Sequence, residues 1–216
     1  MSIVKIWEEI PSLKQIQEIH PEAKGILVDM DGTLLNSEPI HARSLREALV
    51  KLTGNQDLMS AEELDEKFRG EHDPLVFARC INEKILSNEI SLGEFLLAKS
   101  KVVIQESRKS LDQLFHQDMD KLINEIAKSE MSMGLVTNSE SDVTLDVLQR
   151  LDIIHHFNPI ICRGDCEFSK PDPMPYQHAL ELLKLAPNQV VVLEDSKAGL
   201  QAAINAKTLV HQVKWF

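Results

Sequence analysis

Apolar and polar positions along the chain follow two different periods. Short apolar runs are bounded by glycine, proline or acidic turns, as is typical of buried strands. Between these runs, apolar residues recur at spacings of three and four, which indicates amphipathic helices. Strands are expected at residues 25–28, 131–136, 159–162, 189–193 and 208–213, and helices at 143–151, 174–185 and 198–205. This alternation predicts a parallel, Rossmann-like α/β sheet.

A block without strand alternation separates the first strand from the second. Helices are expected there at residues 38–52, 61–69, 73–87, 92–107 and 111–128. Ser60 and Ser91 stand at helix starts, with Glu63 and Glu94 at capping-box spacing. The pattern predicts an α/β core formed by residues 1–37 and 108–216, with a helical insertion at residues 38–107.

The first 22 residues carry isoleucines at roughly helical spacing, with Pro11 as a break. We expect residues 1–22 to form a helical arm that packs on the core, and binding to a partner is the alternative role for this arm.

Composition narrows the classes of partner. The formal net charge of −11 argues against nucleic acid or an anionic membrane surface as a partner. An acidic protein also repels a phosphorylated substrate, unless a metal ion or a lysine offsets the charge locally. No apolar run approaches the roughly 20 residues of a membrane span, and no signal peptide is apparent. Three cysteines without a CxxC motif suggest a reducing compartment, so a cytoplasmic location is expected.

Polar residues follow three of the predicted strands. Because the carboxyl ends of parallel strands meet at one edge of a sheet, we expect these residues to line one crevice. Lys170 lies on a loop that can reach the same crevice. The residues at the strand ends are Asp29 and Asp31, Thr137, Asn138 and Ser139, and Glu194 and Asp195.

These side chains favour phosphate chemistry. Carboxylates without clustered histidine or cysteine suit Mg²⁺ better than zinc. A lysine, a hydroxyl and backbone N–H groups together can hold the oxygens of a phosphoryl group. The set predicts phosphoryl transfer through an aspartyl-phosphate.

The same residues carry a family resemblance. Asp29-Met-Asp31-Gly32-Thr33-Leu34, Leu135-Val136-Thr137-Asn138, Lys170-Pro171-Asp172-Pro173 and Leu193-Glu194-Asp195-Ser196 resemble the four motifs of the haloacid dehalogenase superfamily of phosphohydrolases. Within it, the chain most resembles the branch of sugar-phosphate phosphatases and β-phosphoglucomutase. The resemblance implies that residues 38–107 are a helical cap domain.

The resemblance also implies a role for each core residue. Asp29 would be the nucleophile, and Asp31 the general acid and base. Thr137 and the Asn138 amide, beside Lys170, would hold the transferring phosphoryl group. The metal ligands would be Asp29, Asp31, Asp195 and Glu194.

Cap residues bear on the choice between phosphatase and mutase. His41 stands where this branch places a histidine near the general acid, and a role as an ordinary helix residue is the alternative. The mutases grip a second phosphate with a cap arginine, but Asp73 stands at about that position here and Arg69 precedes the turn. Glu71 and His72 would face the leaving group or remain solvated loop residues.

The sequence therefore predicts a Mg²⁺-dependent phosphatase that hydrolyses a small phosphorylated metabolite, such as a sugar or polyol phosphate. A monomer or weak homodimer is expected. A β-phosphoglucomutase-type mutase and a non-catalytic binding module on the same fold are the alternatives.

Overall fold

A parallel sheet forms the centre of the larger part of the molecule. The computed structural model describes residues 3–68 and 73–216. Within these residues the sheet has six strands in the order β1-β6-β5-β2-β3-β4, and every neighbouring pair is parallel. The strands are β1 (Lys5–Trp7), β2 (Gly25–Val28), β3 (Ser132–Val136), β4 (Ile160–Ile161), β5 (Val190–Glu194) and β6 (Leu209–Val213).

The central strand β2 decides where the functional residues lie. All four of its residues are buried, as expected for a strand covered on both faces. It pairs with β3 on one side and β5 on the other, with Val28 opposite both Leu135 and Leu193. The three strands therefore end at the same level, and the residues that follow them meet at one edge of the sheet.

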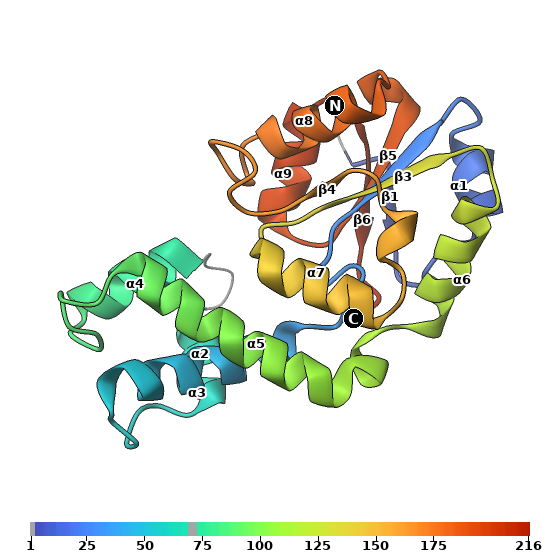
Figure 1. Cartoon of the computed structure of the whole chain (residues 1–216). Coiled ribbons are helices and arrows are strands. Elements are labelled where there is room, and N and C mark those ends of the chain that lie inside the picture. The colour runs from blue at the N-terminus through green and yellow to red at the C-terminus, as the bar shows by residue number, and fades with distance from the viewer. Residues whose placement is uncertain (1–2, 69–72) are drawn as a thin grey trace. The chain divides into compact units, whose positions relative to one another are not determined.

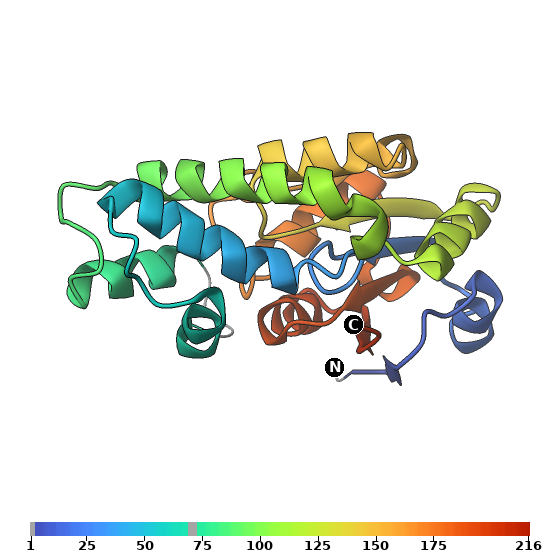
Figure 2. The same cartoon turned by 90° about the horizontal axis from the view of Figure 1, so that it is seen from below.

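Helices cover both faces of the sheet (Figure 1). Helices α8 (Met174–Leu183) and α9 (Lys197–Asn205) pack on one face, in a core that includes Leu27 and Val192. Helices α1 (Leu13–Ile19), α6 (Gln117–Ala127) and α7 (Ser141–Arg150) lie on the other. Figure 2 shows the yellow α7 and the red α9 on opposite sides of the sheet. Two short 3₁₀ helices, η1 (Ile154–His156) and η2 (Pro187–Gln189), complete this layered arrangement, which confirms the predicted α/β fold class.

The chain divides into two compact units, residues 1–36 with 111–216 and residues 37–110. The second unit contains helices α2 (Glu38–Thr53), α3 (Ala61–Phe68), α4 (Asp73–Asn82) and most of α5 (Leu92–Leu114). Its own apolar core includes Leu49, Leu64 and Phe95.

Both predicted capping boxes of the second unit are present. The Ser60 hydroxyl accepts the N–H of Glu63, and the Glu63 carboxylate accepts the N–H of Ser60. Ser91 and Glu94 make the same reciprocal pair. Each pair satisfies backbone donors that the first helical turn leaves without intrahelical acceptors.

Three predicted elements differ from the structure. The arm over residues 1–22 is helical only at α1, because Lys5–Trp7 instead pairs with His211–Val213 as an edge strand. Helix α5 continues to Leu114 and α6 starts at Gln117, so the break predicted at residues 108–110 lies at residues 115–116, and no glycine or proline stands between Gly93 and Leu114 to end α5 earlier. Helix α4 ends at Asn82, and Lys84 adopts a left-handed backbone conformation with φ of 61°.

None of the helices in the described parts of the chain has the length and apolar character needed to cross a membrane.

Candidate active site

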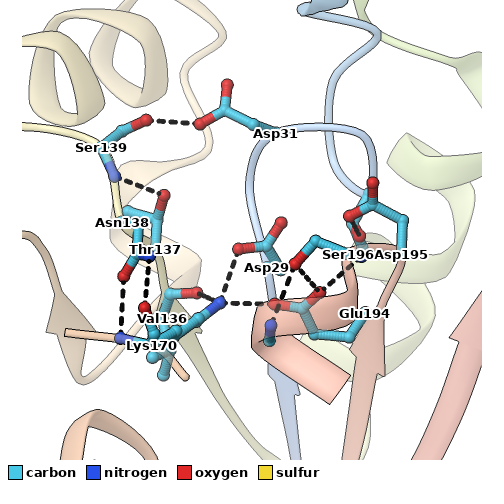
Figure 3. Close-up of polar contacts among 12 residues, drawn as sticks. Asp29, Asp31, Val136, Thr137, Asn138, Ser139, Lys170, Glu194, Asp195 and Ser196 are labelled. Atoms are coloured by element: carbon cyan, nitrogen blue, oxygen red, sulfur yellow. Dashed lines mark hydrogen bonds and ion pairs between the residues drawn. The ribbon is translucent and has the colours of Figure 1, made fainter. Parts of the chain in front are cut away.

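Lys170 lies at the centre of the polar residues that follow the strands (Figure 3). Its ammonium group donates to Asp29 Oδ1 at 2.7 Å, to Glu194 Oε1 at 2.6 Å and to the carbonyl of Val136 at 2.7 Å. These contacts use all three protons of the ammonium group. Lys170 therefore joins the ends of β2, β3 and β5, and any substrate oxygen at Nζ must share or replace one of these contacts.

Asp29 and Asp31 occupy the turn that leaves β2. The Asp29 N–H donates to the carbonyl of Leu193 and so extends the pairing with β5 by one residue. Its side chain is buried, whereas Asp31 is partly exposed and accepts a hydrogen bond from the Ser139 hydroxyl. The two carboxylates are thus held by different neighbours, Asp29 by Lys170 and Asp31 by Ser139.

The turn after β3 brings Thr137 and Asn138 to the same edge. The Thr137 hydroxyl accepts the Ser139 N–H at 3.0 Å, so its own proton remains available to another acceptor. The Asn138 side chain bonds both the N–H and the carbonyl of Lys170, each at 3.1 Å. Asn138 therefore fixes the loop that carries Lys170.

Glu194 is buried among several donors at the end of β5. Besides Lys170, the Tyr176 hydroxyl donates to Oε1 at 3.2 Å. Both the N–H and the hydroxyl of Ser196 lie 3.0 Å from Oε2. A Cβ atom at Gly199 would overlap this carboxylate, so the first turn of α9 needs glycine there. These contacts hold the Glu194 side chain in one orientation.

Asp195 packs against the first acidic turn. The Thr33 hydroxyl donates to Asp195 Oδ1 at 3.1 Å. Gly32 adopts φ of 80°, and a Cβ atom there would overlap the Asp195 carboxylate. Glycine at position 32 therefore serves both the turn and the close approach of the acid.

The site carries more negative than positive charge. Burial raises the pKa of Asp29 well above its usual value and Glu194 adds to this, while Lys170 offsets part of it. Burial, followed by Glu194, raises the pKa of Asp195 to about 7. Burial by itself would lower the pKa of Lys170, but Asp29 and Glu194 raise it well above its usual value. One ammonium group thus balances several carboxylates.

This charge balance and donor set fit a divalent cation. Each of Asp29, Glu194 and Asp195 offers an oxygen within 4.8 Å of the others. Hard oxygen donors suit Mg²⁺, and a bound cation would offset the repulsion by Glu194 that, after burial, helps to raise the pKa values of Asp29 and Asp195.

The predicted cap residues belong to the second unit, residues 37–110. His41 lies on α2 in the second unit. Arg69, Glu71 and His72 fall at residues 69–72, outside the described residues. Their suggested roles remain predictions.

Two residues at the site received no role from the sequence. Ser139 was recognised as a polar strand-end residue, but its contact with Asp31 depends on the turn geometry. Tyr176, the only tyrosine of the chain, is fully buried, and Lys170 Nζ lies 5.0 Å from the centre of its ring. Its position in the first turns of α8, six residues after Lys170, was the available signal.

A cluster of acids around a lysine at the carboxyl ends of parallel strands defines the class as a Rossmann-like α/β protein with a strand-end active site. A family model described as haloacid dehalogenase-like hydrolase matches residues 26–213. The chain belongs to this hydrolase family, which confirms the resemblance seen in the motifs.

Several similar proteins carry the names of phosphatases. The chain is 29% identical over 187 residues to a phosphoglycolate phosphatase of Vibrio cholerae, covering 85% of this chain and 80% of that protein. It is 26% identical over 187 residues to a phosphorylated carbohydrates phosphatase of Thermotoga maritima, covering 85% and 81%. The crystal structure of CbbY from Rhodobacter sphaeroides in complex with phosphate shares the fold, with a TM-score of 0.76, 22% identity and coverage of 87% and 84%.

Proposed function

We propose that this protein is a Mg²⁺-dependent phosphatase that hydrolyses a small phosphate monoester through an aspartyl-phosphate on Asp29. The observation that carries the proposal is the division between the two acids of the first turn. Asp29 is buried beside Lys170, while Asp31 is partly exposed and held by Ser139. One acid is thus suited to attack phosphorus, and the other to exchange protons with a leaving group or water.

The reaction takes two displacements. In the first, a carboxylate oxygen of Asp29 attacks phosphorus, the bond to the ester oxygen breaks, and that oxygen takes the proton of Asp31. In the second, Asp31 takes a proton from water as the water oxygen attacks phosphorus and the bond to Asp29 breaks. Inorganic phosphate leaves, and both acids return to their starting states.

The surrounding residues hold and balance charge during these steps. Lys170 and the Thr137 hydroxyl supply donors for the oxygens of the phosphoryl group, beside the Asn138 amide. Asp29, Asp195 and the backbone carbonyl of Asp31, with Glu194 beside them, would hold Mg²⁺, whose positive charge would favour attack by one anion on another. Tyr176 and Ser196 keep Glu194 in position against Lys170.

We further propose that the second unit serves as the cap that selects the ester. The names of the relatives from Thermotoga maritima and Vibrio cholerae favour a phosphorylated carbohydrate or a small phosphorylated acid as the substrate class. Asp73, where the mutases would carry an arginine, pairs with Lys99. A carboxylate at this position would repel a second phosphate group rather than bind it. This supports hydrolysis of a monophosphate over migration of the phosphate.

Release of phosphate from p-nitrophenyl phosphate and from a panel of sugar and polyol phosphates tests the proposal. We expect turnover that requires Mg²⁺, stops with EDTA and is abolished by Asp29→Asn. Absence of turnover across the panel with Mg²⁺ present would contradict it. Isomerisation of glucose 1-phosphate that depends on a bisphosphate would assign the mutase reaction instead.

A further inference from the structure

The indole of Trp215 reaches the acidic turn from the far end of the chain. After β6, the Lys214 N–H donates to the carbonyl of Trp7 at 2.8 Å and so continues the pairing with β1. The next residue is Trp215, whose Nε1 donates to the carbonyl of Thr33, in the turn after β2, at 2.9 Å. A segment 182 positions away in the sequence thus holds the turn that follows Asp31.

Thr33 is held on two sides. Its carbonyl accepts from Trp215, while its hydroxyl donates to Asp195 Oδ1 at 3.1 Å. Thr33 is fully buried, so solvent cannot readily replace a lost partner. The orientation of the peptide that Trp215 fixes therefore also sets where the Thr33 hydroxyl meets Asp195.

We propose that Trp215 is a positioning residue for the metal-binding carboxylates. Through Thr33, it holds the acidic turn and Asp195 at the separation that one Mg²⁺ ion requires. This inference rests on the proposed function, since it concerns the same cation. Trp215 itself touches neither the cation nor the substrate.

The inference predicts a specific defect when the indole N–H is lost. In Trp215→Phe the aromatic ring remains but the donor does not, so the turn gains freedom that metal binding must then remove. A hydrogen bond worth about 1 kcal/mol corresponds to a change of about fivefold in affinity. We expect the Kd for Mg²⁺ to rise about fivefold, with an unchanged KM for the ester at saturating Mg²⁺.

Calorimetric titration with Mg²⁺ alone, in the full chain without substrate, measures this affinity independently of turnover. Trp7→Phe is the matched control, because it also removes an indole donor, but one that serves His211 rather than the acidic turn. We expect its Kd for Mg²⁺ to remain within twofold of the parent. It also leaves Trp215 as the only tryptophan, whose fluorescence should change on titration with Mg²⁺. Thermal unfolding without metal establishes that both variants fold.

The outcomes separate this inference from the proposed function. A parent that binds Mg²⁺ and hydrolyses esters, with a Trp215→Phe variant of equal Mg²⁺ affinity, overturns the role of Trp215 and leaves the phosphatase intact. An equal loss of Mg²⁺ affinity in Trp7→Phe and Trp215→Phe also overturns it. The loss would then follow from a general disturbance of the β1–β6 pair and not from the hydrogen bond to Thr33. A parent that neither binds Mg²⁺ nor hydrolyses any ester overturns both.

Discussion

Lys170 Nζ and Glu194 Oε1 lie 2.6 Å apart, with side chains that are 2% and 0% exposed. A buried carboxylate without a cation is costly, and so is a buried ammonium group without an anion. The two side chains therefore depend on each other for the stability of the site. Because the same ammonium group also contacts Asp29, the stability of the core and the chemistry of the nucleophile depend on one lysine.

Replacement of that lysine should affect both properties. We expect Lys170→Met to lower the unfolding free energy by about 3–5 kcal/mol, because it leaves Asp29 and Glu194 buried without their cation. Turnover should fall below detection. Chemical denaturation and phosphate release measure the two effects. Lys197→Met is the control, since Lys197 is exposed at the start of α9, and it should change the unfolding free energy little. Equal stability of the two variants would contradict the role assigned to Lys170.

Ser139 offers a test of how Asp31 is oriented. We expect Ser139→Ala to lower kcat about tenfold, a fraction of the 10²–10⁴ that a general acid and base typically contributes. The KM should change little, because the hydroxyl holds Asp31 rather than the ester. Steady-state kinetics at saturating Mg²⁺ give both constants. Ser141→Ala, at the exposed start of α7, should match the parent. A defect confined to KM would assign Ser139 to substrate binding instead.

The strand-end residues could be predicted because backbone geometry alone brings them together. In a parallel sheet, whatever follows β2, β3 and β5 must meet at one edge, so Asp29, Thr137 and Glu194 needed no knowledge of side-chain packing. Lys170 was also predictable, because its loop leads into the helix before β5.

Contacts that depend on the path of a turn or a tail were not predictable. Whether the Ser139 hydroxyl or its N–H faces Asp31 depends on dihedral angles that the residue type leaves open. Trp215 meets Thr33 after the chain has left β6, the strand with which Lys5–Trp7 pairs. A three-residue strand has too few positions to show a period of two. The isoleucines near it have helical spacing, so the sequence predicts a helix where β1 forms.

Two glycines in helices should respond in opposite ways to the same substitution. We expect Gly199→Ala to destabilise the protein and reduce turnover, because the new methyl group would overlap the Glu194 carboxylate. Gly93→Ala lies in the first turn of α5, where the nearest atom is Ser91 Oγ at 4.0 Å. It should raise the unfolding free energy by up to about 1 kcal/mol through helix propensity. Thermal unfolding compares the two, and a stabilised Gly199→Ala variant would show that Glu194 can move away at little cost.

A histidine pair beside the edge strand β1, His211 on β6 and His20 after α1, should make stability depend on pH. Trp7 Nε1 donates to His211 Nδ1 at 2.8 Å, so the neutral His211 ring carries its proton on Nε2, 2.8 Å from His20 Nε2. A proton added at Nδ1 would face the indole N–H. Burial lowers the pKa of His211 from 6.5 to about 4, and His20 and Lys5 contribute. Burial also lowers the pKa of His20.

The sign of the effect follows from these shifts. Well above pH 6.5 neither the folded nor the unfolded chain protonates His211, and its contribution to stability is complete. As the pH falls toward about 4, the unfolded chain binds a proton at His211 that the folded chain does not, so this residue lowers the unfolding free energy. The raised pKa values of Asp29 and Asp195 act in the opposite direction, because there the folded chain binds the protons. We therefore expect the loss of about 2–3 kcal/mol from His211 as a difference between the parent and a His211 variant, measured by urea denaturation at several pH values.

Substitution separates this pair from the other titrating groups. His211→Gln removes the ring that the folded state keeps neutral, so between pH 6.5 and about 4 the variant should lose about 2–3 kcal/mol less than the parent, even though it is less stable at pH 7. His178→Gln is the control, because it also removes one histidine but from a side chain that is 42% exposed. The slope of that control should match the parent. If His211→Gln showed the same pH dependence of the unfolding free energy as the parent, the histidine pair would not contribute to that dependence.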